Sequence, residues 1–158
     1  MKRAALPAGR LGGVDYGRRR IGVAVCDARR MLASPLCVRE TTGDHEADAA
    51  FFRALVTDEE LVGFIVGLPI HADGRPSDMS REAERFGAWL ERVTGLPVAF
   101  HDERYTSHEA AGRLTGAGLS RARKKSRADA VAAQVILSSW LERDAAGDEP
   151  GGAGAGEP

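Results

Sequence analysis

Residues 11–26 read LGGVDYGRRRIGVAVC and contain two runs of small or β-branched residues. This pattern predicts a β-hairpin with strands over residues 11–17 and 21–26, joined through residues 17–20. In the second strand Ile21, Val23 and Val25 alternate with small residues, so neither of its faces is polar. A strand with two apolar faces indicates a sheet that is covered on both sides.

The residues that follow extend the hairpin into an α/β fold. Apolar runs predict strands over 31–39, 62–66 and 97–101, and helical spacing predicts helices over 48–56, 77–93, 106–114 and 126–141. Gly95 stands where the second helix would end, and Ser126 is the expected cap of the last one. A meander followed by crossover connections gives a mixed sheet between helices.

The composition is that of a globular chain. Its 158 residues are 43% hydrophobic and 28% charged, which is typical of a single core. We expect a flexible segment over 1–10, the folded domain over 11–143 and a disordered tail over 144–158, where Gly, Ala, Pro and acidic residues have little to bury. Cys26 and Cys37 show no Cys-x-x-Cys spacing, which disfavours a disulfide framework or a structural zinc site. The longest apolar run, over 61–70, is too short to cross a bilayer.

The charge is nearly balanced overall but uneven along the chain. Lys and Arg number 22 against 23 Asp and Glu, a net charge of −1, which by itself disfavours a nucleic-acid partner. Two segments, 18–20 and 121–127, are nevertheless strongly basic, and acids gather after Trp140.

Three carboxylates stand at the ends of apolar elements. Asp15 follows the first strand, Glu103 follows the strand over 97–101, and Asp129 precedes the apolar stripe of the last helix. Each has a structural alternative, since Asp15 can start a turn, Glu103 adjoins a possible Asp102–Arg104 ion pair, and Asp129 can cap its helix. Taken together, three such carboxylates predict an oxygen-ligated Mg²⁺ site.

Four motifs resemble the YqgF/RuvX family in order and spacing. They are Asp15-Tyr16-Gly17 followed by Arg20-Ile21-Gly22-Val23-Ala24-Val25, Gly67-Leu68-Pro69 followed by Asp73-Gly74, Asp102-Glu103-Arg104-Tyr105-Thr106-Ser107, and Asp129-x-x-Ala132-Ala133. They cover roughly residues 11–141, and motifs matched in order are far more specific than a lone Asp-x-Gly. His71, where relatives often carry Asn, and the Gly-rich tail depart from the family without touching the acids.

This resemblance implies a ribonuclease-H-like fold, with five strands ordered 3-2-1-4-5 and helices on both faces. It implies a nuclease, a hydrolase acting on ester bonds with Mg²⁺ or Mn²⁺, that processes the 5′ end of pre-16S rRNA during ribosome biogenesis. Resolution of Holliday junctions is the alternative. By this likeness Asp15, Glu103 and Asp129 are the catalytic acids and the metal ligands.

The same likeness sets the expected partners. We expect nucleic acid as the substrate, with pre-rRNA favoured over a four-way DNA junction, and the ribosome precursor as a partner, the protein being either a monomer or a homodimer. The cysteine usage and the short apolar runs predict a cytoplasmic protein with no membrane contact.

Basic residues next to the three acids are expected to bind phosphates. These are Arg18, Arg19, Arg20, Arg104, Lys124 and Lys125. The alternative for the basic runs is a solvated loop, and the alternative for Arg104 is an ion pair with Asp102.

Other conspicuous residues are interpreted as structural. His101 is expected to be a strand residue and His108 an exposed helix residue. Phe86, Trp89 and Leu90 keep helical spacing, so we interpret them as core and not as a platform for stacking bases. Gly67 is expected to permit a close backbone approach at the end of a strand.

Two other classes of protein share parts of this pattern. Asp15-x-Gly17 on a hairpin also resembles the first phosphate loop of actin-like ATPases and sugar kinases, but those contain two such domains and this length suits one. A non-catalytic nucleic-acid-binding or ribosome-assembly module would keep the fold. It predicts that Asp15→Asn leaves function unchanged, whereas a nuclease loses cleavage.

Overall fold

A five-stranded mixed sheet forms the centre of the molecule in this computed structural model, which describes residues 6–105 and 121–147. The strand order is β3-β2-β1-β4-β5, which confirms the order that the family resemblance implies. The strands are β1 (Arg10–Asp15), β2 (Arg20–Cys26), β3 (Ala33–Glu40), β4 (Leu61–Leu68) and β5 (Val98–Asp102). The first three form an antiparallel meander, and β4 and β5 extend it in parallel beyond β1.

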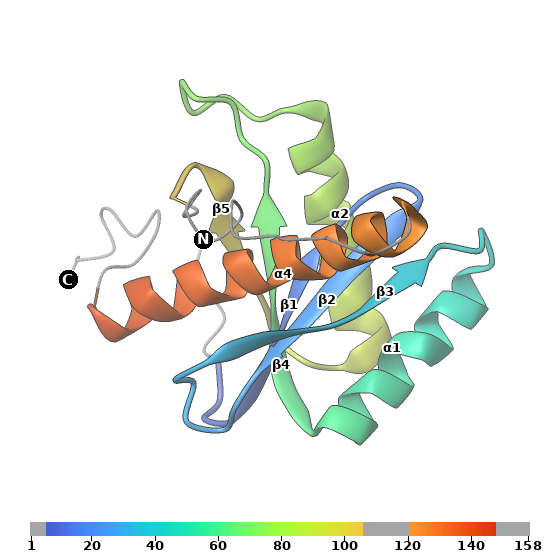
Figure 1. Cartoon of the computed structure of the whole chain (residues 1–158), viewed down its shortest axis with the longest axis horizontal. Helices are drawn as coiled ribbons and strands as arrows, with labels where there is room; N and C mark the ends of the chain where they lie inside the picture. The colour runs from blue at the N-terminus through green and yellow to red at the C-terminus, as the bar shows by residue number, and fades with distance from the viewer. Residues whose placement is uncertain (1–5, 106–120, 148–158) are drawn as a thin grey trace.

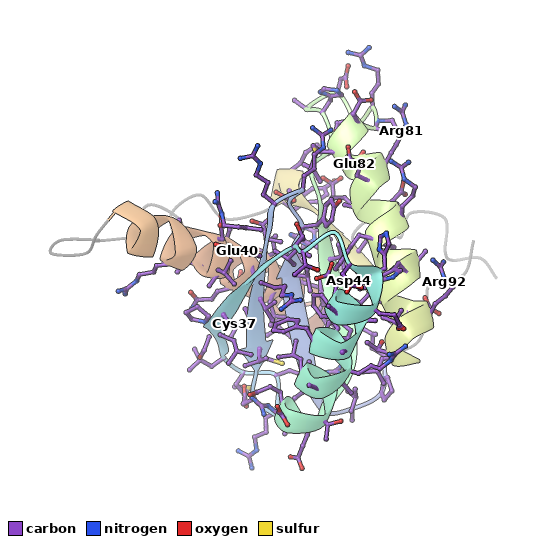
Figure 2. All side chains as sticks on the ribbon, turned by 90° about the vertical axis from the view of Figure 1, so that its right-hand side faces the viewer. Cys37, Glu40, Asp44, Arg81, Glu82 and Arg92 are labelled. Atoms are coloured by element: carbon purple, nitrogen blue, oxygen red, sulfur yellow. The ribbon has the colours of Figure 1, made fainter. Side chains whose placement is uncertain are left out.

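Helices cover both faces of the sheet, as predicted. Helices α1 (His45–Glu59) and α2 (Asp78–Thr94) pack on one face, and α4 (Arg121–Ala145) crosses the other, drawn in orange in front of the sheet in Figure 1. Figure 2 turns the α1–α2 side toward the viewer and shows these two helices next to each other. Within the described ranges, none of the helices combines the length and the apolar character needed to cross a membrane.

The alternating side chains of β2 explain the two cores. Ile21, Val23 and Val25 join the cluster under α1 and α2, whereas Ala24 and Cys26 join the cluster under α4. The absence of a polar face on β2 therefore follows from burial on both sides.

Capping residues set the ends of α1 and α2. Ser77 caps α2 through the backbone N–H of Ser80, and Gly95 ends it with φ of 74°, which confirms the predicted end of this helix. The helix predicted over 48–56 is longer, because the Asp44 side chain accepts hydrogen bonds from the backbone of Glu46 and Ala47 and so starts α1 at His45.

The predicted start of the last helix was wrong. Helix α4 begins at Arg121, not after Ser126, because residues 121–125 are Arg, Ala and Lys, which favour helix. Asp129 consequently lies inside the helix, and its interpretation as part of an N-terminal cap falls. The helix predicted over 106–114 lies outside the described residues.

Helix α4 packs directly against two glycines of the sheet, Gly13 of β1 and Gly22 of β2. A Cβ on Gly22 would lie 2.0 Å from the Asp129 carbonyl oxygen, and a Cβ on Gly13 would lie 2.7 Å from Leu137 Cβ. Real Cβ atoms do not come so close to such neighbours, so both strands require glycine there. Backbone contact thus fixes the height of Asp129 above β2.

Candidate functional site

Asp15 is the last residue of β1 and the centre of the candidate site. It pairs with Gly22 across the hairpin, and its side chain is only partly exposed. Burial raises the pKa of Asp15 to about 6, and the negative charge of Asp129 adds to the increase. The Asp15 carboxylate is therefore held in an environment that opposes its ionisation.

Glu103 reaches the same end of the sheet from β5. It opens a short 3-10 turn, η1 (Glu103–Tyr105), directly after the strand. Its Oε2 would lie 2.8 Å from a Cβ on Gly67, the residue of β4 that pairs with His101. The predicted close approach at Gly67 is present, although the neighbours are the side chains of Glu103 and Ile136 instead of backbone.

The pKa of Glu103 rises to about 7. Burial is the main cause, followed by the charges of Asp15 and then Asp102. Asp15 and Glu103 therefore repel each other within a partly desolvated site, which favours a cation between them.

Asp129 belongs to α4, which packs on β1 and β2. Its Oδ2 accepts a hydrogen bond from Arg20 Nε across 2.8 Å, and this ion pair joins the first residue of β2 to the interior of α4. Both side chains are about two-thirds buried, with exposures of 31% for Arg20 and 27% for Asp129. Arg20 thus supplies the positive charge next to Asp129.

Two of the predicted acids, Asp129 and Glu103, lie within electrostatic range of the third, Asp15. Across residues 6–105 and 121–147, however, no three His, Cys, Asp or Glu side chains lie close enough together to hold a metal ion. The donor chemistry suits Mg²⁺, because all three donors are carboxylates and Asp15 and Glu103 carry repelling, desolvated charge. Arg20 holds the third donor.

Basic residues surround this end of the sheet. An open pocket of about 390 Å³ is lined by Asp15, Asp129, Gly17, Met79 and the arginines Arg18, Arg19 and Arg20. Arg18 forms an ion pair with Glu82 of α2, with Arg18 Nε 3.0 Å from Glu82 Oε1, and Arg19 is exposed. The structure therefore brings the first basic run next to two of the acids.

The remaining predicted phosphate ligands are placed differently. Arg104 forms an ion pair with Asp102, with Nε 2.9 Å from Oδ2, which is the structural alternative for this residue. Lys124 and Lys125 lie on the first turns of α4, and their side chains are outside the described residues.

The histidine and aromatic interpretations have mixed outcomes. His101 is a fully buried strand residue, as expected, and burial lowers its pKa to about 4, so it is uncharged at neutral pH. His108 lies outside the described residues. Phe86 and Leu90 are core residues, but Trp89 is partly exposed and lines a second pocket.

Two ion pairs of the site, Arg20–Asp129 and Arg18–Glu82, could not be predicted from the sequence. Arg20 and Asp129 are 109 positions apart, and Glu82 is one of several acids on an amphipathic helix. Helical spacing does assign Glu82 to a less buried face of α2, but only the packing of α2 beside the hairpin turn selects it as the partner of Arg18.

Comparison with known proteins gives a consistent family. The family model described as "RuvX: Holliday junction resolvase" matches residues 9–143. A protein of Rhodopirellula baltica named "Putative pre-16S rRNA nuclease" is 48% identical over 134 residues, which cover 85% of this chain and 77% of that protein. One of the same name from Dechloromonas aromatica is 42% identical over 128 residues, covering 81% and 87%.

A solved structure shares the fold. Thermus thermophilus RuvC in complex with a Holliday junction substrate superposes with a TM-score of 0.53, covering 88% of this chain and 96% of that chain. Its sequence identity is 13%, so the likeness concerns the arrangement of the sheet and helices alone.

Proposed function

The chain belongs to the RuvX family, and we propose that it is a divalent-metal-dependent nuclease that hydrolyses phosphodiester bonds at the 5′ end of pre-16S rRNA. The membership rests on a family model that matches residues 9–143 and on relatives more than 40% identical. The reaction class, hydrolysis of nucleic acid, follows from the family.

One observation carries the proposal for this chain: the partly buried Asp15 at the end of β1 lies within electrostatic range of both Glu103 and Asp129. Desolvation and mutual repulsion raise the pKa of Asp15 to about 6 and that of Glu103 to about 7. Such an arrangement is unfavourable for the apoprotein and favourable for binding a divalent cation.

Asp15 and Glu103 would hold the metal, with Asp129 as the third ligand once Arg20 releases it. When bound, divalent ions activate a water molecule for attack and stabilise the leaving oxygen of a phosphodiester. The partial burial that raises the pKa of the acids also strengthens their electrostatic interaction with a bound cation.

The arginines of the hairpin turn would bind the substrate backbone. Arg20, when it leaves Asp129, is placed to donate to a phosphate oxygen at the site, and Arg19 is exposed beside it. Arg18, fixed by Glu82, adds positive charge at the edge of the same pocket. Lys124 and Lys125 would extend this surface along α4.

The names of the relatives indicate the class of substrate. Their names favour pre-16S rRNA, and with it a protein that meets the ribosome precursor in the cytoplasm. The description of the family favours a four-way DNA junction as the second candidate. A junction resolvase needs two active sites and hence a symmetric dimer, whereas trimming of one RNA end does not.

The test is cleavage by the purified chain with Mg²⁺ or Mn²⁺, offered a 5′-extended 16S rRNA fragment and a four-way DNA junction in parallel. We expect cleavage of the RNA near its mature 5′ end, and we expect Asp15→Asn to abolish cleavage while RNA binding in EDTA persists. Asp58→Asn, an exposed site on α1, is the matched control and should cleave as the unaltered chain does.

The alternatives give different results. Cleavage of the junction alone would replace the RNA proposal with junction resolution. No cleavage of either substrate, or equal activity in Asp15→Asn, would leave a binding module and overturn the nuclease proposal.

A further inference from the structure

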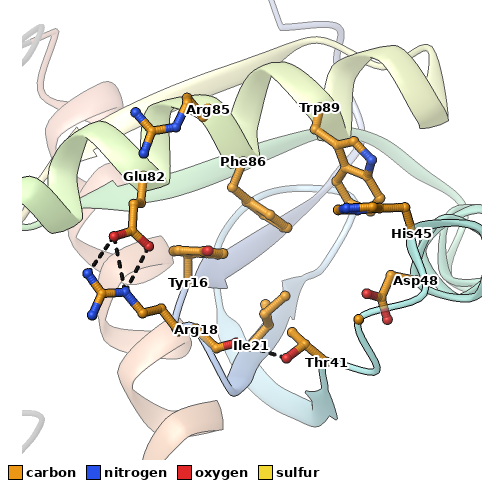
Figure 3. Close-up of a pocket in the computed structure, with 11 residues that line it drawn as sticks. Tyr16, Arg18, Ile21, Thr41, His45, Asp48, Glu82, Arg85, Phe86 and Trp89 are labelled. Carbon is orange, nitrogen blue, oxygen red and sulfur yellow. Dashed lines mark hydrogen bonds and ion pairs between the residues drawn. The ribbon is translucent and has the colours of Figure 1, made fainter.

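A second pocket lies directly beside the candidate site, on the face of the sheet that α1 and α2 cover. Its volume is about 410 Å³, within the range of roughly 300–1,000 Å³ that small-ligand sites occupy. Figure 3 shows its walls, formed by the β1–β2 turn, the start of α1 and the middle of α2. The mechanism proposed above does not use this pocket.

Aromatic rings form one wall of this pocket. Tyr16 and Phe86 have ring centroids 4.9 Å apart, and Phe86 and Trp89 have centroids 5.6 Å apart, with each pair tilted by 30–36°. Phe86 is buried behind the other two, whereas Tyr16 and Trp89 are partly exposed. Partly exposed Tyr and Trp rings offer stacking surfaces that any nucleobase can use.

A buried acid stands opposite this wall. Asp48 of α1 is 9% exposed and lines the pocket. Among the described residues its hydrogen bonds all end on Oδ1, from Arg39 Nη2 at 3.0 Å, Arg39 Nε at 3.2 Å and Thr42 Oγ1 at 3.3 Å. The second oxygen, Oδ2, is therefore available as an acceptor, and an ionised carboxylate accepts only from donors such as N–H groups.

Positive charge lies at the mouth of the pocket. Arg18 lines both this pocket and the one that contains Asp15, so the two pockets share a wall. Arg85 of α2 also lines the pocket, and no ion pair within the part of the chain described here engages it. A nucleic-acid backbone that passes Asp15 would meet these two arginines.

The turn that carries Tyr16 and Arg18 is held in place. Thr41 Oγ1 donates to the Arg18 carbonyl oxygen at 2.8 Å, and the Thr41 backbone N–H donates to the Arg19 carbonyl oxygen at 2.9 Å. The pocket is thus largely formed before any ligand enters, which lowers the entropic cost of binding.

We propose that this pocket binds one unstacked nucleobase of the substrate strand, next to the phosphodiester at Asp15, and that it prefers a base with amino donors over uracil. The base would stack on Trp89 and Tyr16 and donate to Asp48, while Arg18 and Arg85 bind the flanking phosphates. This inference rests on the proposed nuclease function, because it places the base on the strand being cleaved. It gives the enzyme a sequence preference beside the cut.

The test measures binding without cleavage. The full chain in EDTA is titrated with two single-stranded RNAs of equal length, one of uridines only and one with a single central guanosine. Trp89 fluorescence reports occupancy, and Trp140, 2% exposed under α4 on the other face, gives a constant background. The RNAs carry equal charge, and we expect the guanosine-containing RNA to bind about tenfold more tightly, because a carboxylate accepts from its amino group.

Variants assign the preference to the pocket. Binding of both RNAs by Trp89→Leu, followed by fluorescence anisotropy of labelled RNA, should weaken about tenfold, whereas Trp89→Phe keeps a stacking ring and most of the affinity. Asp48→Asn keeps a side-chain oxygen that can accept from Arg39 but removes the carboxylate. The affinities for the uridine-only RNA and the guanosine-containing RNA should therefore become equal. Arg85→Ala should weaken binding of both RNAs, because it removes a cation that lines the pocket. Arg81→Ala, on the outer side of α2 in Figure 2 and away from the pocket, is its matched control and should bind as the unaltered chain does.

The outcomes separate this inference from the function it rests on. Equal affinity for the two RNAs, or equal affinity of Trp89→Leu and Trp89→Phe, overturns the base pocket, even if cleavage with metal is intact. A guanosine preference that Asp48→Asn removes supports the pocket, even if the metal-dependent cleavage assay fails and the nuclease proposal falls.

Discussion

Arg20 Nε lies 2.8 Å from Asp129 Oδ2, so the first residue of β2 holds an acid from the middle of α4. The pair gives Asp129 a cationic partner at the site. Burial and neighbouring acids raise the pKa values of Asp15 and Glu103, and the charge of Asp129 contributes to the increase at Asp15. The metal-free site therefore holds one carboxylate paired with an arginine beside two desolvated carboxylates.

Removing Arg20 should destabilise the metal-free protein. In Arg20→Ala, Asp129 loses its cation and faces Asp15 without compensation, and we expect a loss of about 1 kcal/mol, the upper range for a partly exposed pair. Urea denaturation at pH 8 in EDTA measures this loss, and added Mg²⁺ should recover part of it. Arg19→Ala, its exposed neighbour, should change little, and an equal loss in both variants would contradict the assigned pair.

The stability of the metal-free protein should fall as pH rises from about 4 to 7. The folded pKa values of Asp15, about 6, and Glu103, about 7, exceed their ordinary values of 3.8 and 4.5, so in this window the folded state binds more protons than the unfolded state. Stability is fully present below the unfolded pKa values and is lost as pH passes the folded ones.

Asp15→Asn removes one of these contributions. It should be more stable than the unaltered chain at pH 8, by on the order of 2 kcal/mol, with the difference vanishing near pH 4. Denaturation curves across this pH range in EDTA provide the measurement. Asp58→Asn should follow the unaltered chain, and a parallel pH profile for Asp15→Asn would refute the burial of this charge.

Divalent metal should stabilise the fold in a pH-dependent way. At pH 8 the ionised acids bind Mg²⁺ or Mn²⁺ and the melting temperature should rise, whereas at pH 5 proton binding to Asp15 and Glu103 competes and the rise should be small. Differential scanning calorimetry with and without metal tests this. An equal rise in Asp15→Asn would show that the metal binds elsewhere.

Two glycines should be essential for the geometry of the site. Gly22→Ala would place Cβ 2.0 Å from the Asp129 carbonyl oxygen, and Gly67→Ala would place it 2.8 Å from Glu103 Oε2. We expect each to cost roughly 1–3 kcal/mol and to reduce cleavage strongly, because an acid is displaced. Gly95→Ala, with φ of 74° but no neighbour within 4 Å, should lose stability through backbone strain and keep cleavage. Retained cleavage in Gly22→Ala would contradict this prediction, because it would show that the backbone of α4 can move away from β2 while the Asp129 carboxylate keeps its place.

Local patterns predicted most of the fold. The hairpin over 11–26 and the helix end at Gly95 depend on neighbouring residues, and both are present. The predicted start of α4 at Ser126 was wrong. Serine is a good N-cap residue in isolation, but the helix-forming residues before it extend the helix back to Arg121. The family resemblance, not periodicity, supplied the strand order.

The catalytic roles of Asp15, Glu103 and Asp129 stay a prediction. The sequence placed each acid at the end of an apolar element, and the structure puts Asp129 and Glu103 within electrostatic range of Asp15, with Asp129 inside α4. It could not predict that Arg20 pairs with Asp129, because that contact depends on how α4 crosses β2. Trp89 was assigned to the core because spacing identifies the apolar stripe of a helix and not which edge of that stripe stays open.

Gly13 and Gly22, which lie against α4, make the two faces of the sheet respond differently to substitutions that change side-chain volume. Under α1 and α2 the contacts are between side chains such as Phe52, Phe64 and Phe86, which can change rotamer when a neighbour changes volume. Under α4 the Asp129 backbone rests on Gly22 with no side chain between them, so no rotamer change can absorb a displacement. Volume changes in the α1–α2 core can therefore be offset in part by neighbouring side chains, whereas any side chain at position 22 must displace the backbone that carries Asp129.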